Sequence, residues 1–266
     1  MALLNIFVLA IVQGITEFLP ISSSGHLLFI APVTGWPDQG LALDIAVHVG
    51  SLGAVTLYFW RDIVGIARAL LTPKRDTSAA DLQLFGHVII GSIPTVVFGG
   101  FLFLLLSLEL RSLLLVAVTT IVFGLLLGWA DRSFADKKQL RQMTAQDAFI
   151  IGLLQIFALL PGTSRSGVTM MAARMRGINR TDGAHFSMLL SIPTILGAGT
   201  LATLSLLNDG DVEVGFDAVL AGGISFIVAL CAIGLLMRWI DRIGFTPFII
   251  YRLILGALLI GVYFYL

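Results

Sequence analysis

Six long apolar stretches constrain this chain more than any other feature of its sequence. Each is about as long as the roughly 20 residues that a helix needs to cross the hydrocarbon core of a bilayer. They are Leu41–Trp60, Leu82–Ser107, Ser112–Ala130, His185–Leu206, Ala218–Met237 and Phe245–Leu266. Their apolar residues are continuous rather than alternating, which favours helices over the strands of a transmembrane barrel. We therefore expect an all-α polytopic membrane protein, a single membrane domain over residues 1–266 with six transmembrane helices.

The composition agrees with this prediction. Charged residues make up 12% of the chain and hydrophobic residues 58%, whereas about 25% of the residues of a soluble domain are charged. So little polar surface excludes a soluble enzyme, and a formal net charge of zero gives no reason to expect a nucleic acid partner. Cys231 is the only cysteine, which excludes an intrachain disulfide and a cysteine-based metal site.

Two further apolar segments, within residues 1–33 and 147–175, are too short to span a membrane. Polar residues and a proline interrupt each of them, Pro20 in the first and Pro161 in the second. Irregular backbone at membrane depth persists only where protein buries it or where it faces a water-filled cavity. We therefore expect two re-entrant helix hairpins whose polar breaks meet inside the membrane.

The two breaks resemble each other. The first reads QGITEFLPISSSGH (Gln13–His26) and the second reads QIFALLPGTSRSGVT (Gln155–Thr169). The glutamine and the Ser-Gly pair recur at the same spacing, which indicates an internal duplication of one hairpin plus three spans. Because three is an odd number, the two halves, roughly residues 1–130 and 147–266, are expected to form an inverted repeat.

The basic residues orient the chain, because Lys and Arg concentrate in cytoplasmic loops. They cluster in alternate connections, at Arg61, Arg68, Lys74, Arg75, Arg132, Lys137, Lys138, Arg141, Arg174, Arg176, Arg180, Arg238 and Arg242. Residues 206–217 hold four acidic residues and no basic one. With six spans and both termini outside, every basic cluster faces the cytoplasm and only Arg111 lies in an outer loop. The first hairpin then enters from the outer face and the second from the inner face.

Ionisable side chains at membrane depth are costly and are therefore candidates for function. Gln13 and Glu17 are four residues apart and share a helix face before the first break, where their oxygens suit a divalent cation such as Mg²⁺ or Ca²⁺. The segment Ser22–Gly25 then opens a second short helix, and such a helix N-terminus is an anion site. His26 follows, where it can act as a general base or a nucleophile.

Arg165 is the ionisable group of the second break, and hydroxyl groups surround it. Ser164 and Ser166 flank it, and Thr163 and Thr169 lie nearby. A guanidinium among hydroxyls at a helix start suits phosphate. Each group alone has a structural explanation, such as snorkelling for an arginine or satisfaction of a kink for Ser and Thr. Their coincidence in two matched breaks favours a functional site.

Four other polar residues in the spans receive structural interpretations. Asp44 lies near the outer end of its span, which favours a helix-terminal or capping role. His48 and His87 are interpreted as pore-facing groups or as hydrogen bonders between helices. Arg252 falls near the cytoplasmic end of the last span, where its side chain can snorkel to the interface.

An arginine, a carboxylate and two anion sites suit phosphoryl transfer, which depends on charge neutralisation and in-line positioning. A lipid phosphate, with its tail among the helices, fits a polar pocket in an apolar body. Two alternatives stay open at this point. Inverted repeats and broken helices are also typical of a transporter or lipid flippase, and a serine–histidine pair at Ser23 and His26 suggests an intramembrane protease.

The two breaks also carry a family resemblance. QGITEFLPISSSGH is similar to the first signature, and PGTSRSGVT (Pro161–Thr169) to the second, of the bacterial undecaprenyl-diphosphate phosphatase family of the bacitracin-resistance (BacA/UppP) type. The resemblance extends over the whole chain in length and in span order. It implies hydrolysis of undecaprenyl diphosphate to the monophosphate and phosphate in the bacterial inner membrane, at a site open to the periplasm. The reaction recycles the lipid carrier of peptidoglycan synthesis and confers bacitracin resistance.

The resemblance assigns roles to individual residues. The motif acids fall on Gln13 and Glu17, the histidine on His26, the arginine on Arg165, and the hydroxyls on Ser22, Ser23, Ser24, Ser164, Ser166 and Thr169. Glutamine at position 13, where the motif also allows glutamate, leaves Glu17 as the sole acid for a cation. The expected partners are the polyprenyl diphosphate and membrane lipids, with no nucleic acid and with a homodimer left open.

These assignments define the expected mechanism. Arg165, the hydroxyls of both breaks and the backbone around Gly25 bind the phosphates, and Glu17 with Gln13 holds a divalent cation or assists a proton transfer. The nucleophile is Ser23, His26 or a water molecule activated by His26, and we favour Ser23.

Overall fold

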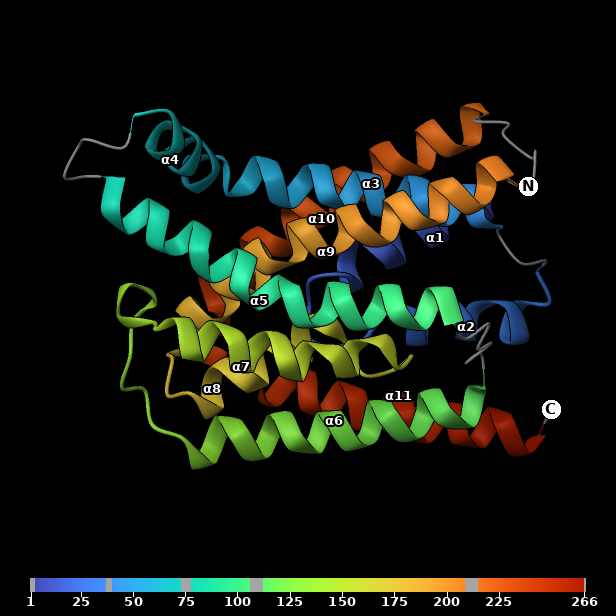
Figure 1. The fold of residues 1–266 in the computed structure, drawn as a ribbon. Coiled ribbons are helices and arrows are strands. Elements are labelled where there is room, and N and C mark those ends of the chain that lie inside the picture. Colours follow the sequence, from blue (N-terminus) through green and yellow to red (C-terminus); the bar gives the residue numbers. More distant parts are fainter. Residues whose placement is uncertain (1–2, 37–39, 73–77, 106–111, 209–214, 266) are drawn as a thin grey trace.

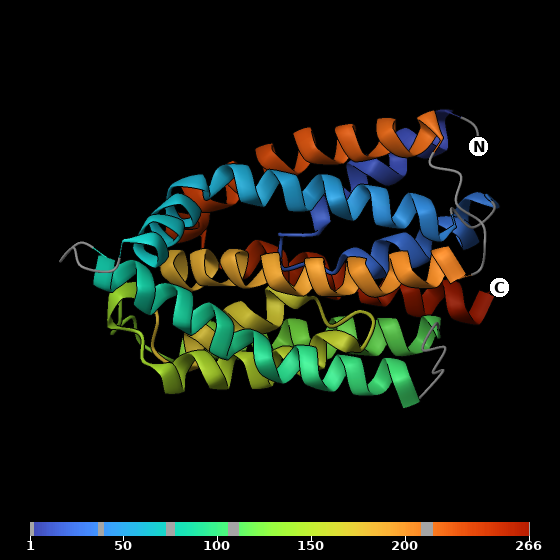
Figure 2. The same ribbon diagram turned by 45° about the horizontal axis from the view of Figure 1, so that its top comes forward.

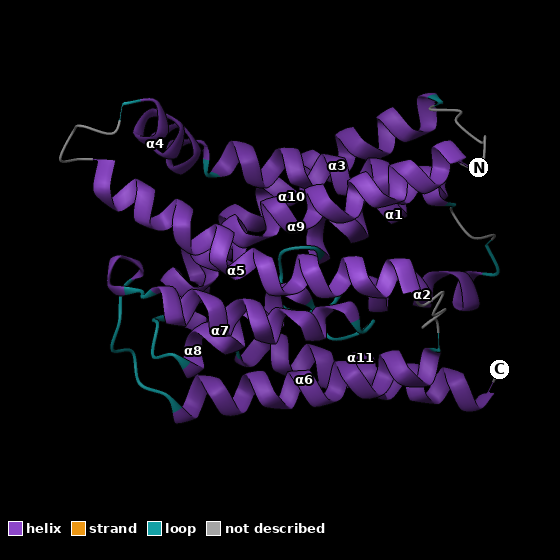
Figure 3. Cartoon of the chain, in the orientation of Figure 1, coloured by secondary structure: helices purple, strands orange, loops and turns teal. Residues whose placement is uncertain are grey.

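The computed structural model describes residues 3–36, 40–72, 78–105, 112–208 and 215–265, and in these ranges the chain is almost entirely helical (Figure 3). The helices are α1 (Leu3–Thr16), α2 (Ser23–Thr34), α3 (Leu41–Tyr58), α4 (Trp60–Leu71), α5 (Ser78–Leu105), α6 (Leu113–Ser133), α7 (Ala145–Gln155), α8 (Arg165–Met175), α9 (Arg180–Asn208), α10 (Phe216–Ile243) and α11 (Thr246–Tyr265), with 3₁₀ turns η1 (Leu140–Gln142) and η2 (Ile156–Leu159). Within these ranges the only β-type pairing is one isolated bridge.

The prediction of six transmembrane helices is confirmed. Helices α3, α5, α6, α9, α10 and α11 are long and apolar enough to cross a membrane, and they correspond one to one with the six apolar stretches. The boundaries differ most at the polar helix ends, since α10 continues to Ile243 beyond Met237 and α9 begins at Arg180 rather than at His185. The Asp182 backbone N–H donates to Asn179 Oδ1 (2.8 Å), and Asn179 Nδ2 donates to Asp182 Oδ2 (2.7 Å). This reciprocal cap starts the helix in a polar turn, which a search for apolar residues does not detect.

The connection after the first span contains a helix, α4, where the sequence indicated only a basic loop. This helix carries Arg61 and Arg68 and lies across one end of the bundle (Figure 1). Its Leu70 and Leu71 are exposed, as expected for an amphipathic helix at a membrane interface. The remaining basic residues of this connection, Lys74 and Arg75, and the outer-loop residue Arg111 lie outside the described residues.

Both ends of the chain lie at the same end of the bundle, as six spans require (Figure 1). Helix α4 and the connections around α7 and α8 lie at the opposite end. The described basic clusters belong to that opposite end, because they occur in α4, after α6, in η1, at the end of α8, at the start of α9 and at the end of α10.

Two short helix pairs occupy the middle of the bundle. Helices α1 and α2 reach it from the end that holds the termini, and α7 and α8 reach it from the opposite end (Figures 1 and 2). Each pair is a helix, a break and a second helix, at the positions expected from the sequence. Re-entry of these pairs from opposite membrane faces stays a prediction.

Close contacts between glycines fix the helices that surround the breaks. A Cβ atom on Gly50 of α3 would overlap the backbone of Gly222 of α10, and one on Gly152 of α7 would overlap the backbone of Gly91 of α5. Small residues allow such close approach where lipid supplies no hydrophobic driving force between helices. The largest apolar core cluster includes Phe18 beside the first break and Val168 after the second, so the core encloses both polar breaks.

Candidate active site

The two breaks contact each other directly. The Gly162 backbone N–H donates to Ser24 Oγ (3.2 Å), and Ser166 Oγ donates to the Leu19 carbonyl (3.0 Å). Each bond joins one break to the other, so the expected meeting of the two breaks is observed. Their polar groups satisfy one another inside an apolar bundle, where an unpaired polar group is costly.

The local geometry of the breaks repeats. Ser22 and Ser164 adopt positive φ angles, 75° and 69°, which in the described chain no other residue except glycine adopts. Ser22 Oγ accepts from the Gly25 N–H (3.3 Å), and Ser164 Oγ accepts from the Gly167 N–H (3.2 Å). A strained backbone of this kind persists only where its surroundings enforce it, and it clusters at functional sites. The matched sequence spacing thus has a matched geometry, while duplication of the complete halves stays a prediction.

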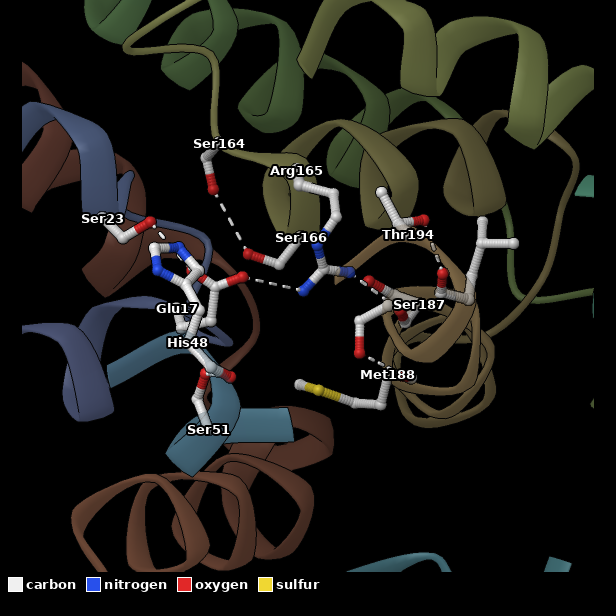
Figure 4. Close-up of polar contacts among 12 residues, drawn as sticks. Glu17, Ser23, His48, Ser51, Ser164, Arg165, Ser166, Ser187, Met188 and Thr194 are labelled. Atoms are coloured by element: carbon white, nitrogen blue, oxygen red, sulfur yellow. Dashed lines mark hydrogen bonds and ion pairs between the residues drawn. The ribbon is translucent and has the colours of Figure 1, made fainter. Parts of the chain in front are cut away.

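Glu17 is the centre of the polar cluster (Figure 4). Gln13 Nε2 and Ser23 Oγ both donate to Glu17 Oε2 at 3.0 Å. Glu17 follows α1 and Ser23 begins α2, so the first break folds its own serine back onto its own carboxylate. A hydroxyl at this distance from a carboxylate has the geometry of a nucleophile beside its general base.

Arg165 faces this cluster from the second break. Its Nη2 lies 3.6 Å from Glu17 Oε1, and its Nη1 donates to the Ser187 carbonyl of α9 (3.1 Å) (Figure 4). Its Nε and Nη2 atoms are buried and have no hydrogen-bond partner. A guanidinium stays charged at neutral pH, and the Glu17 carboxylate beside it balances that charge. The arginine therefore retains donors for an anionic ligand.

A cavity of about 330 Å³ contains these groups. The two breaks contribute Glu17, Ser23, Ser24, Ser164 and Arg165, and residues of α3 and α9 form the remaining walls. The cavity continues into apolar clefts of about 300 and 390 Å³ between α3 and α9 and beside α10. One cleft therefore leads from the charged cluster to apolar surface.

The other residues predicted to bind phosphate make contacts inside the protein and do not face the cavity. Ser22, Gly25, Ser166 and Thr169 are absent from the cavity wall. The Ser22 and Ser166 hydroxyls take part in the bonds between and within the breaks described above. Thr169 Oγ1 lies 2.6 Å from Ser187 Oγ, which packs α8 against α9.

The structure does not bring His26 into the cavity. Its Nδ1 lies 2.6 Å from the Ser22 carbonyl and its Nε2 2.6 Å from the Tyr251 hydroxyl of α11. A carbonyl only accepts, so Nδ1 carries the proton and Nε2 accepts from Tyr251. This assignment is that of the neutral imidazole.

His48 and Asp44 of α3 line the cavity instead. His48 Nδ1 lies 2.7 Å from the Asp44 carbonyl, and His48 Nε2 lies 3.8 Å from Glu17 Oε2. His48 thus faces a cavity, as one of its two sequence interpretations expected, and Asp44 lies in the first turn of α3, as expected for a helix-terminal residue. Their spacing of four residues on one helix face was the available signal, but sequence alone does not reveal that this face of α3 is turned toward the first break.

The structure contradicts the prediction that the Arg252 side chain reaches the membrane interface. Its side chain does not snorkel, because it is fully buried and donates to backbone carbonyls of both breaks, among them Gly162 (3.1 Å) and Thr163 (3.0 Å). Carbonyls that leave a helix need new donors, and an arginine from α11 supplies them here.

Comparison with known proteins shows the family to which this chain is similar. Residues 6–258 match the family model described as bacitracin resistance protein BacA. A relative from Ruegeria pomeroyi named undecaprenyl-diphosphatase is 47% identical over 98% of this chain and 99% of its own length. Another of that name from Alteromonas mediterranea is 48% identical over 98% of both chains. Undecaprenyl-diphosphatase 1 of Rhodospirillum rubrum is 45% identical over 98% of this chain and 95% of its own.

Proposed function

The chain belongs to the bacitracin resistance protein BacA family, and from that membership we infer that the cavity at Glu17 and Arg165 is a phosphatase site. The protein is an integral-membrane undecaprenyl-diphosphatase, which hydrolyses undecaprenyl diphosphate to undecaprenyl phosphate and phosphate. It thereby recycles the lipid carrier of peptidoglycan synthesis and gives bacitracin resistance. The observation that supports this cavity as the site is Arg165, whose buried, unpartnered N–H groups lie beside the Glu17–Ser23 pair.

The shape of the cavity suits a lipid diphosphate. Its charged end matches the phosphates, since Arg165 offers a forked set of donors to their oxygens. Ser24 and Ser164 add hydroxyls to the same wall. The apolar clefts between α3 and α9 would hold the first isoprene units, while the remaining tail stays among lipids. Because the bilayer is as apolar as the cleft, the tail adds little to the binding free energy, but it orients the diphosphate in the cavity.

In the proposed reaction, Ser23 Oγ attacks the terminal phosphorus and passes its proton to Glu17. A bond forms between Oγ and phosphorus, and the bond from phosphorus to the bridging oxygen breaks. The electron pair goes to that oxygen, which leaves as undecaprenyl phosphate. Water then attacks the phosphoserine, and the Oγ–phosphorus bond breaks as Glu17 returns its proton to Oγ. Both protons of the water leave with the phosphate product, which is released as dihydrogen phosphate.

Arg165 stabilises the charge that develops on the transferring phosphoryl group. Donors fixed in a site that excludes water are worth more than the same donors in bulk water. The contact between Nη1 and the Ser187 carbonyl anchors the guanidinium on α9, so its side chain loses little conformational freedom when substrate binds.

The site suits a divalent cation that is bound jointly by the protein and by the phosphates of the substrate. Among the described residues, no three His, Cys, Asp or Glu side chains gather where they could hold a metal ion. Gln13 Oε1, however, is buried beside Glu17 and has no hydrogen-bond partner. Mg²⁺ is commonly bound by one or two carboxylates together with substrate phosphates. Glu17 and Gln13 would hold Mg²⁺ or Ca²⁺, which when bound neutralises phosphate charge.

We propose that the cavity opens to the periplasm across the inner membrane. The basic clusters lie at the end of the bundle opposite the termini, and Lys and Arg concentrate on the cytoplasmic side. The cavity wall includes Leu41 and Asp44 at the start of α3, toward the end that holds the termini. An impermeant maleimide should label Leu41→Cys in intact cells in a Cys231→Ala background. Absence of labelling until the cells are opened would reverse the orientation.

The decisive assay is release of phosphate from undecaprenyl diphosphate by the purified protein in detergent. We expect the wild type to turn over, and Glu17→Gln, Ser23→Ala and Arg165→Lys each to lose about 100-fold or more in kcat, the scale of acid–base and oxyanion effects. Arg238→Lys, an exposed control, should match the wild type. No phosphate release by the wild type would refute the function, as expected for a flippase.

Two additions test the chemistry. EDTA should abolish turnover, and Mg²⁺ or Ca²⁺ should restore it; turnover that persists in EDTA excludes the cation. A quench during turnover should trap phosphate on Ser23, detected by mass spectrometry. Phosphate on His26, or no phosphoenzyme at all, would replace Ser23 by His26 or by water as the nucleophile.

A further inference from the structure

Arg252 is a fully buried arginine to which neither the family motifs nor the proposed reaction gives a role. It lies on α11, the last transmembrane helix, far in sequence from both breaks. No described carboxylate forms an ion pair with it, and its partners are backbone carbonyls. Burial of an arginine that makes no ion pair is expensive, which indicates that the side chain has a specific task.

One guanidinium joins four carbonyls from three segments. Nε donates to Thr120 of α6 (3.0 Å), and Nη1 to Pro20 of the first break (3.4 Å). Nη2 donates to both Gly162 (3.1 Å) and Thr163 (3.0 Å) of the second break. A planar fork with five N–H groups can reach in these directions at once, whereas the three donors of a lysine radiate from one atom.

The carbonyls that Arg252 binds lie next to the residues of the proposed site. Pro20 lies midway between Glu17 and Ser23 in the sequence, and Thr163 precedes Ser164 and Arg165. Because these break residues are outside regular helix, no helical hydrogen-bond ladder fixes them. The guanidinium therefore ties together the backbone segments that carry the Glu17–Ser23 pair and Arg165, in addition to the direct bonds between the breaks.

A motif glycine supports this arrangement. A Cβ atom on Gly167 would lie 2.8 Å from Arg252 Nη1, so glycine leaves room for the guanidinium beneath the start of α8. Gly124 of α6 is similarly close, since its Cβ would lie 3.3 Å from Arg252 Nε. Two helices thus present glycine to the same side chain.

We propose that Arg252 is a positioning residue of the phosphatase reaction, which holds the two breaks in the relative orientation that phosphoryl transfer requires. It touches no substrate and acts through the backbone of both breaks. This inference rests on the proposed function, because it concerns the alignment of that same site. A misplacement of reacting groups by about 1 Å can cost about 100-fold in rate.

The test compares Arg252→Lys with Arg174→Lys in detergent-purified protein. Arg174 serves as the control, because it is also buried and also donates to backbone carbonyls, those of Phe134 and Ile178, although unlike Arg252 it pairs with Asp131 and Asp136 as well. It lies at the opposite end of α8 from the site. Both variants should lose thermal stability. Only Arg252→Lys should lose about 100-fold in kcat per folded molecule, with the KM for undecaprenyl diphosphate within about threefold of the wild type.

Several results would overturn the inference. They are a wild-type kcat in Arg252→Lys, an equal loss of kcat in both variants, or a raised KM with unchanged kcat. If Arg252→Lys does not fold, Gly167→Ala keeps the arginine but displaces it, and should lower kcat in the same way; full activity there would refute the inference. Failure of the wild type to release phosphate refutes the proposed function instead, so the two failures are distinguishable.

Discussion

Asp147 is expected to hold the α7–α8 pair in place at the end of the bundle opposite the termini. Its carboxylate is fully buried and accepts from Lys138 Nζ (2.9 Å), from Arg176 Nε (2.7 Å) and from the Thr144 backbone N–H (3.0 Å). Lys138 precedes α7 and Arg176 follows α8, so one carboxylate ties together both ends of the α7–α8 pair. Asp147→Asn removes the charge and keeps the size of the side chain.

The expected cost follows from these contacts. Removal of one partner from a buried, hydrogen-bonded ion pair typically costs about 3–5 kcal/mol. An asparagine still offers one oxygen to Thr144, so we expect about 3 kcal/mol at pH 7. The Glu17–Arg165 cavity lies at the far end of α8, so kcat should stay close to that of the wild type at temperatures where the variant is folded.

The effect should depend on pH in a defined direction. Burial alone would raise the pKa of Asp147, but the hydrogen bonds from Lys138, Thr144 and Arg176 outweigh it and hold the pKa well below its ordinary value. A carboxyl whose pKa falls on folding stabilises the protein above its unfolded pKa of about 4, and this stabilisation is lost as the pH falls through the folded value. The difference between wild type and Asp147→Asn should therefore be full at pH 7 and narrow below about pH 4.

Thermal unfolding in detergent from pH 3 to pH 7 measures this difference. Asp241→Asn serves as the control, because Asp241 is an exposed aspartate at the end of α10, and exposed substitutions usually change stability by less than about 0.5 kcal/mol. Equal unfolding midpoints of wild type and Asp147→Asn at pH 7, or a difference that does not change with pH, would refute the reasoning.

Three further predictions concern the cavity and its walls. His48→Asn removes the Nε2 atom that faces Glu17 and should lower kcat for phosphate release about tenfold or more; a wild-type kcat would show that this contact is idle. Gly152→Ala places a methyl group against the Gly91 backbone and should lower the unfolding midpoint, whereas Gly197→Ala, whose Cβ meets open space, should not; equal midpoints would contradict the close packing. Gly199→Phe fills the cleft between α3 and α9 and should raise KM for undecaprenyl diphosphate more than for a short-chain prenyl diphosphate; an equal rise for both would place the tail elsewhere.

Much of the fold follows from hydropathy because a bilayer allows few solutions. Every backbone polar group must be satisfied in hydrocarbon, so a continuous apolar stretch of sufficient length becomes a spanning helix. The six spans were therefore predictable, and only polar helix ends such as that at Asn179 and Arg180 escaped detection. Helix α4 was missed for the complementary reason, since an interfacial helix alternates apolar and charged faces and has no long apolar stretch.

The site was predictable in part, because its residues are polar where polarity is costly. Glu17, Ser23 and Arg165 come together as their positions in two matched breaks suggested. The sequence does not show which of His26, Asp44 and His48 line the cavity, because this depends on which face of each helix is turned inward. The orientation of each helix face depends on neighbours distant in sequence, such as Tyr251, whose hydroxyl forms a hydrogen bond with Nε2 of His26.

Arg252 shows why hydropathy alone misjudges a charged residue in a span. The same side chain can reach the interface or turn inward, and its sequence position near a helix end does not distinguish the two. Its direction depends on where hydrogen-bond donors are needed. The two breaks leave backbone carbonyls without helical partners inside the bundle, and these carbonyls need donors. In this chain an arginine of another span meets that demand, together with the hydroxyls of Thr119 and Thr120.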